Sequence, residues 1–134
     1  MRVICIIQAR LGSRRLPRKV LELIAGRPMV HHVIERARLI PGVHDVVLAV
    51  PRTDVGMLVG LDCPFYLGSP VDGLDRVRGA AKEQGAEGIV RVTGDCPLLD
   101  PSFSGQVVLG ALEQKADYAS NVGEKTDGLD TEFM

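Results

Sequence analysis

The chain has 134 residues, of which 46% are hydrophobic and 25% charged, and its formal net charge is −1. This length supports one hydrophobic core and is too short for two comfortable ones, so we expect a single domain over residues 1–134. The composition excludes a disordered or fibrous chain, and the charge does not match a nucleic-acid-binding protein, which is usually strongly basic.

The sequence also bears on location and redox state. It contains no run of 18 apolar residues and no signal-peptide pattern, so we expect a cytoplasmic protein without a membrane partner. The cysteines, Cys5, Cys63 and Cys96, are odd in number and far apart, which fits neither a disulfide framework nor a zinc site. We expect them to be free thiols.

The first predicted element is a buried strand at Val3–Gln8, where apolar and β-branched residues run without interruption. The loop that follows, residues 9–19, holds five of the 16 basic residues and no carboxylate, so the rest of the chain is net acidic. A local concentration of positive charge fits one small polyanion better than a nucleic acid.

This cationic loop matches neither of the common nucleotide-binding motifs, because Gly12 is its only glycine and no Ser or Thr follows its lysine. Its residues still suit a phosphate chain: glycine and serine let the backbone turn closely around an anion, and the cations neutralise it. A solvated basic loop is the alternative. The candidate phosphate-binding residues are Arg10, Gly12, Ser13, Arg15 and Lys19.

Strands and helices alternate along the remainder of the chain. An apolar stretch at 20–24 and a turn at 25–28 follow the cationic loop. Hydrophobic periodicity together with Pro, Gly and capping residues then predicts helices at 29–39, 70–84 and 101–114, and a shorter helix at 54–61. Asp100 is the predicted cap of the helix at 101–114. A second buried-strand pattern occupies 45–50, and further strands are predicted at 64–67, 88–93 and 117–121. This alternation predicts an α/β fold, a three-layer α/β/α sandwich with a mainly parallel sheet.

Ligands of such sheets bind outside the carboxyl ends of the strands, which here brings together the loops at 9–19, 68–75 and 93–100. The strand ending in Thr93-Gly94-Asp95 delivers a carboxylate to the edge that carries the cationic loop. An acid facing a phosphate site is repelled unless a divalent cation lies between them, so Asp95 is a candidate Mg²⁺ ligand. The alternative is that Asp95 only caps a turn. Arg91 either points along its strand toward the phosphate or forms a structural ion pair.

Several segments together resemble one known family. The segments "IIQARLGSRRLPRK", "GRPMVHHVIERA", "GSPVDGLDRV", "VRVTGDCPLLDP", "YASN" and "DGLD" occur in the order found in cytidylyltransferases of the spore coat polysaccharide biosynthesis type. These are relatives of the CMP-sialic acid and CMP-Kdo synthetases and have the nucleotide-diphospho-sugar transferase fold. The resemblance covers essentially the whole chain.

The resemblance implies roles for individual residues. It assigns Ala9 and Arg10 to the loop over the base and triphosphate, Arg15 and Lys19 to the phosphates, and Asp95 to Mg²⁺. Thr93 stands where Kdo-activating relatives carry glutamine, so base recognition differs in detail. The residues that the resemblance places near the acceptor are Asp72, Asp75, Arg76, Tyr118, Ser120, Asn121, Asp127 and Asp130.

The activity implied is Mg²⁺-dependent cytidylyl transfer in surface polysaccharide precursor synthesis. An acceptor oxygen of a sugar or sugar acid attacks the α-phosphate of CTP and pyrophosphate leaves, with Lys19, Arg10 and Asp95 as the catalytic residues. Two departures stand out: Arg18 replaces the glycine usual before the lysine, and the family continues well past this length, to a distal aspartate.

Three alternatives remain open at this stage. The chain is either an active enzyme or a truncated, non-catalytic nucleotide-binding module. A glycosyltransferase that consumes a nucleotide sugar is a distant alternative, because the same fold hosts such enzymes and no D-x-D motif is present. The oligomeric state also stays open, with a homodimer as one option.

Overall fold

The computed structural model describes residues 1–12, 15–58, 60–121 and 129–134. Strands, α-helices and two short 3₁₀ helices alternate along these residues. In chain order they are β1 (Val3–Gln8), η1 (Lys19–Leu21), β2 (Leu23–Ile24), β3 (Arg27–Pro28), α1 (Met29–Ala37), β4 (Asp45–Pro51), η2 (Arg52–Leu58), β5 (Phe65–Gly68), α2 (Gly73–Glu83), β6 (Gly88–Thr93), α3 (Pro101–Gln114), β7 (Ala119–Ser120) and β8 (Glu132–Phe133).

The main sheet has the strand order β5-β4-β1-β6-β8-β7. Strands β5, β4, β1 and β6 run parallel, whereas β8 pairs antiparallel with both β6 and β7. The central strand β1 is buried along almost its whole length, with Cys5 opposite Val46 on one side and Val90 on the other. A strand covered on both faces has no polar side, which explains its uninterrupted apolar sequence.

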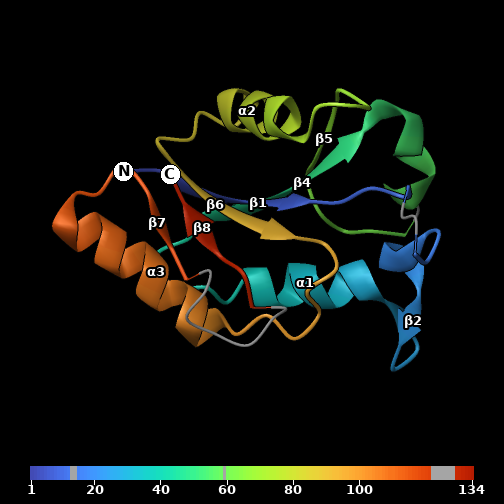
Figure 1. Cartoon of the computed structure of the whole chain (residues 1–134), viewed down its shortest axis with the longest axis horizontal. Helices are drawn as coiled ribbons and strands as arrows, with labels where there is room; N and C mark the ends of the chain where they lie inside the picture. Colours follow the sequence, from blue (N-terminus) through green and yellow to red (C-terminus); the bar gives the residue numbers. More distant parts are fainter. Residues whose placement is uncertain (13–14, 59, 122–128) are drawn as a thin grey trace.

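The sheet lies between two layers of helices. Helix α2 covers one face, and α1 and α3 cover the other (Figure 1). The apolar core divides accordingly: Ile4, Ile6 and Val47 pack on the α2 side, while Cys5, Ile7 and Leu48 pack with α1. The predicted three-layer α/β/α sandwich with a mainly parallel sheet is therefore confirmed.

Two antiparallel elements were not predicted. The stretch at 20–24 forms η1 and β2, and β2 pairs with β3 in a small hairpin that projects from the body (Figure 1). Its turn residues Ala25 and Gly26 both have positive φ, of 50° and 79°, as a type I′ turn requires, although the sequence lacks the usual Asn-Gly signal. Strand β8 has only two residues, too few for a periodic pattern.

Helix ends differ from the predictions by a few residues, as is usual where the last turn frays. Helix α2 begins at Gly73 because the Asp72 carboxylate accepts a hydrogen bond from the Asp75 N–H at 3.0 Å. Asp100 caps α3 as predicted, accepting from the N–H groups of Ser102 and Phe103. In the described part of the chain, no helix combines the length and hydrophobicity that crossing a membrane requires.

Some side chains outside the site also find structural partners. All three cysteines are free thiols, as expected. Arg91 forms an ion pair with Glu132 of β8 at 3.6 Å, which selects the structural alternative for this residue. The ion pair joins the parallel part of the sheet to its antiparallel edge.

Candidate functional site

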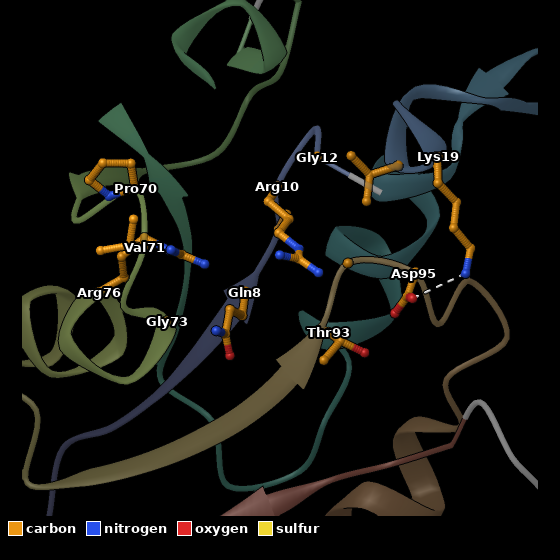
Figure 2. Close-up of a pocket in the computed structure, with 13 residues that line it drawn as sticks. Gln8, Arg10, Gly12, Lys19, Pro70, Val71, Gly73, Arg76, Thr93 and Asp95 are labelled. Carbon is orange, nitrogen blue, oxygen red and sulfur yellow. Dashed lines mark hydrogen bonds and ion pairs between the residues drawn. The ribbon is translucent and has the colours of Figure 1, made fainter. Parts of the chain in front are cut away.

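A cleft of about 380 Å³ opens at the carboxyl ends of β1 and β6. Its walls come from the segments after β1, before α2 and after β6, the three regions expected from the edge of a parallel sheet (Figure 2). The lining residues are Gln8, Ala9, Arg10, Gly12, Lys19, Val20, Pro70, Val71, Gly73, Arg76, Thr93, Gly94 and Asp95.

The loop after β1 is tied to the body by backbone hydrogen bonds. The N–H of Ala9 donates to the carbonyl of Ala49, and the N–H of Leu11 donates to the Asp54 carboxylate at 2.9 Å. The N–H of Arg18 returns to the carbonyl of Leu11 at 3.0 Å, which closes the loop on itself. Arg10 projects from this tethered loop into the cleft (Figure 2).

Arg18 occupies a backbone conformation that favours glycine. Its φ and ψ are 59° and 30°, in the left-handed region, at the residue just before η1. A side chain in this region crowds the following carbonyl, whereas glycine enters it without penalty. The glycine that the resemblance calls for at this position therefore has a physical reason, and η1 begins with Lys19 in spite of the substitution.

Lys19 and Asp95 form an ion pair at one side of the cleft. The Lys19 Nζ lies 3.2 Å from the Asp95 Oδ2, and both side chains are partly exposed (Figure 2). Desolvation raises the pKa of Asp95, but hydrogen bonds from Thr93 and Lys19 and the charge of Lys19 outweigh it, so the pKa is lowered. Asp95 is therefore a carboxylate at neutral pH.

Close backbone packing sets the distance between the first and third loops. The N–H of Gly94 donates to the Gln8 carbonyl at 2.9 Å, and a Cβ placed on Gly94 would lie 2.9 Å from the Ala9 Cβ. A Cβ on Gly73 would meet the Gln8 side chain at 2.1 Å. Glycine at these two positions lets the walls of the cleft approach each other.

Arg76 is a buried cation in the wall of the cleft. It is 4% exposed, and its Nη1 donates to the Ser69 carbonyl at 2.8 Å. Its Nε has no hydrogen-bond partner among the described residues. Desolvation and the charge of Arg10 lower the pKa of the guanidinium. Because Arg76 also lines the cleft, its guanidinium is suited to bind an anionic group of a ligand.

The cleft unites part of the predicted site. Seven predicted residues line it: Ala9, Arg10, Gly12, Lys19, Arg76, Thr93 and Asp95. Sequence reasoning missed Gln8, Val20, Pro70, Val71, Gly73 and Gly94. Two of these residues could have been predicted from the sequence. Gln8 is a polar residue at the end of an apolar strand, and Gly94 lies inside the Thr-Gly-Asp turn.

Other predicted residues do not line the cleft. Arg15 and Asp75 are exposed outside it, and the Asp72 carboxylate caps α2. The remaining predicted acceptor residues that the structure describes, which also lie outside the lining, are Tyr118, Ser120, Asn121 and Asp130. Ser13 and Asp127 lie outside the described residues.

The donor set fits a weakly ligated hard cation. No cluster of three or more His, Cys, Asp or Glu side chains that could hold a metal occurs within the described residues. Mg²⁺ does not require such a cluster, because it is commonly held by one or two carboxylates, water and substrate phosphates. The ionised, partly exposed Asp95 beside the cationic loop is compatible with that mode of binding.

Comparison with known proteins identifies similar sequences. A sequence model of the family described as "Cytidylyltransferase" matches residues 4–131. The 8-amino-3,8-dideoxy-manno-octulosonate cytidylyltransferase of Shewanella sp. (strain W3-18-1) is 37% identical over 81% of this chain. The chain spans about half the length of such relatives, 46% in this instance.

Solved structures have the same architecture. A cytidylyltransferase from Leptospira borgpetersenii serovar Hardjo-bovis (strain JB197) superposes with a TM-score of 0.88 and 28% identity, over 100% of this chain and 60% of that one. A CMP:2-keto-3-deoxy-manno-octonic acid synthetase complexed with CTP gives a TM-score of 0.78 and 28% identity, over 87% of this chain and 49% of its own.

Proposed function

Because the chain belongs to the cytidylyltransferase family, we propose that it binds CTP in the cleft and transfers the cytidylyl group to a sugar acid with release of pyrophosphate. The observation that carries the proposal is that Arg10, Lys19 and Asp95 line one cleft at the carboxyl ends of β1 and β6. Cations and a carboxylate in the same cleft suit a triphosphate with a divalent cation.

The cations of the cleft supply the phosphate contacts. Arg10 and Lys19 neutralise the triphosphate and the charge that develops on the leaving pyrophosphate, which lowers the barrier without a protein nucleophile. Asp95 would hold the Mg²⁺, and the ion would supply further neutralisation of phosphate oxygens. When phosphate replaces Asp95 as the partner of Lys19, the carboxylate becomes available as a ligand.

The acceptor is proposed to be a sugar acid, by analogy with the octulosonate named for the curated relatives. Arg76 suits such a substrate because its guanidinium lies in the wall of the cleft and can bind a carboxylate. We also propose a single catalytic domain, a cytoplasmic location where CTP is available, and a place in surface or spore coat polysaccharide synthesis. These finer points rest on the family resemblance.

The direct test measures pyrophosphate released from CTP and Mg²⁺ with 2-keto-3-deoxy-manno-octonic acid as acceptor. Lys19→Ala and Asp95→Asn should each lower kcat/KM by about 10²-fold or more, the effect typical of losing one preorganised electrostatic contact. Arg78→Ala, which removes an exposed cation on α2, is the matched control and should retain activity. Equal activity of all four proteins would contradict the assigned site.

A second candidate function is nucleotide binding without turnover. It is favoured by the lining of the cleft, in which Asp95 is the one carboxylate among the described residues and would hold a divalent cation with few protein ligands. In this case CTP raises Tm but no pyrophosphate appears with any sugar-acid acceptor. Lys19→Ala should abolish the shift in Tm under both functions, because the shift reports CTP binding. Pyrophosphate release is the measurement that separates the two functions.

A further inference from the structure

A buried polar network lies outside the cleft and joins three separate parts of the chain. Ser104 of α3, Asn121 after β7 and Thr131 before β8 are each at most 5% exposed. The hydroxyl oxygens of Ser104 and Thr131 are 2.6 Å apart. Polar groups at this depth are costly unless they satisfy one another, so the three residues act as one unit.

The Asn121 side chain uses both ends of its carboxamide inside this network. Its Nδ2 donates to the carbonyl of Leu129 at 2.9 Å, and its Oδ1 accepts from the N–H of Thr131 at 2.9 Å. The N–H of Asn121 also donates to the Thr131 carbonyl. Burial together with these bonds favours a role in positioning over direct contact with a ligand.

The network brackets Asp130, because its neighbours Leu129 and Thr131 are both bonded to Asn121. Strand β8 pairs antiparallel with β6, with Arg91 opposite Glu132. Continuing this register by two residues brings Asp130 beside Thr93, which lines the cleft.

We infer that Asn121, Thr131 and Ser104 form a strut that fixes Asp130 at the ligand edge of the sheet, and that Asn121 is a positioning residue for acceptor binding. The kinetic consequence rests on the proposed function. The structural consequence does not, because it concerns only how firmly residues 129–131 are held.

Hydrogen exchange of the full chain tests the structural consequence. The Thr131 amide, which donates to Asn121, should exchange at least about tenfold faster in Asn121→Ala than in the wild type. Gln106→Ala removes an exposed carboxamide from α3 and should leave this rate unchanged. Equal exchange rates in the wild type and Asn121→Ala would overturn the strut.

Steady-state kinetics with CTP and 2-keto-3-deoxy-manno-octonic acid test the positioning role. Asn121→Ala and Asp130→Asn should each raise KM for the acceptor about tenfold and leave KM for CTP unchanged. The double variant should be no worse than either single variant, since both changes act through one contact. Additive effects would overturn positioning through Asp130.

A conservative pair covers the possibility that Asn121→Ala does not fold. Thr131→Ser keeps the hydroxyl and should retain the wild-type KM for the acceptor, whereas Thr131→Val keeps the shape, removes the hydroxyl and should raise it. Equal KM values for this pair would contradict the strut. Absence of turnover in every protein would contradict the proposed function instead, and the exchange rates would then decide the inference.

Discussion

The two sides of the site are built in different ways. On the phosphate side, Arg10 and Asp95 come from loops directly after two neighbouring parallel strands, and Lys19 begins η1 at the end of the first of these loops. On the proposed acceptor side, Asp72 caps a helix and Asn121 is buried in a polar network. The first group faces the cleft, while the second group stabilises the structure around it.

This difference shows how far a shared strand edge constrains a site. Parallel strands bring the residues that follow them to one edge, so a charged residue just after a buried strand reaches the cleft almost by default. A polar residue elsewhere is first available for helix capping or for satisfying buried backbone groups. The predictions below test whether the two sides separate in this way.

Among the substitutions that test this comparison, Gly94→Ala on the phosphate side is expected to change stability and CTP affinity the most. The new Cβ would lie 2.9 Å from the Ala9 Cβ, and because neither atom is the end of a flexible side chain, the two loops must move apart. Overpacking of this kind costs about 1–3 kcal/mol of unfolding free energy, and CTP affinity should fall with it. Chemical denaturation and calorimetric titration with CTP measure the two effects.

Gly56→Ala is the matched control for this substitution. No atom lies within 4 Å of the position that its Cβ would occupy, and its φ is not positive. Its CTP affinity should match the wild type, and its unfolding free energy should rise by up to about 1 kcal/mol, because alanine lowers the entropy of the unfolded chain. If Gly94→Ala behaves in the same way, the close approach of the loops at Ala9 does not shape the cleft.

On the acceptor side, two substitutions of Asp72 separate capping from ligand contact. Asp72→Ala removes the acceptor for the Asp75 N–H and should cost about 1 kcal/mol, whereas Asp72→Asn retains a capping oxygen and should cost little. Thermal unfolding measures both. If Asp72 only caps α2, Asp72→Asn should have the wild-type KM for the acceptor. A higher KM for the acceptor would show that Asp72 also contributes to acceptor binding.

The sheet and the phosphate side were predictable because their signals are local. Uninterrupted apolar runs such as Val3–Gln8 identify buried parallel strands, and the residues after them follow the edge rule. The positions of Arg10, Lys19 and Asp95 in the cleft agree with this reasoning, while their chemical roles remain proposals.

Other features depend on distant partners and leave little trace in the sequence. Strand β8 exists because Phe133 pairs across from Val90, and no two-residue pattern predicts such a pairing. From the sequence Asn121 resembles a polar surface residue, but in the structure its side chain is hydrogen-bonded to the backbone of Leu129 and Thr131. The Nη1 of Arg36, a charged residue of α1, donates to the Leu99 carbonyl at 3.0 Å, a contact that helical periodicity does not predict.

The smallest expected effect tests Arg18, which has a positive φ among the described residues of the loop after β1. Arg18→Gly removes the penalty for a side chain at φ 59°, but it also increases the entropy of the unfolded chain, so the net gain should be about 0.5–1 kcal/mol. Arg15→Gly removes an exposed cation of the same loop, and Arg15 is not among the non-glycine residues with positive φ, so it should give no gain. Denaturant midpoints of the two variants measure the difference. A destabilised Arg18→Gly would mean that the guanidinium contributes more to the loop than its backbone strain costs, and the phosphate side would then depend on side-chain contacts as the acceptor side does.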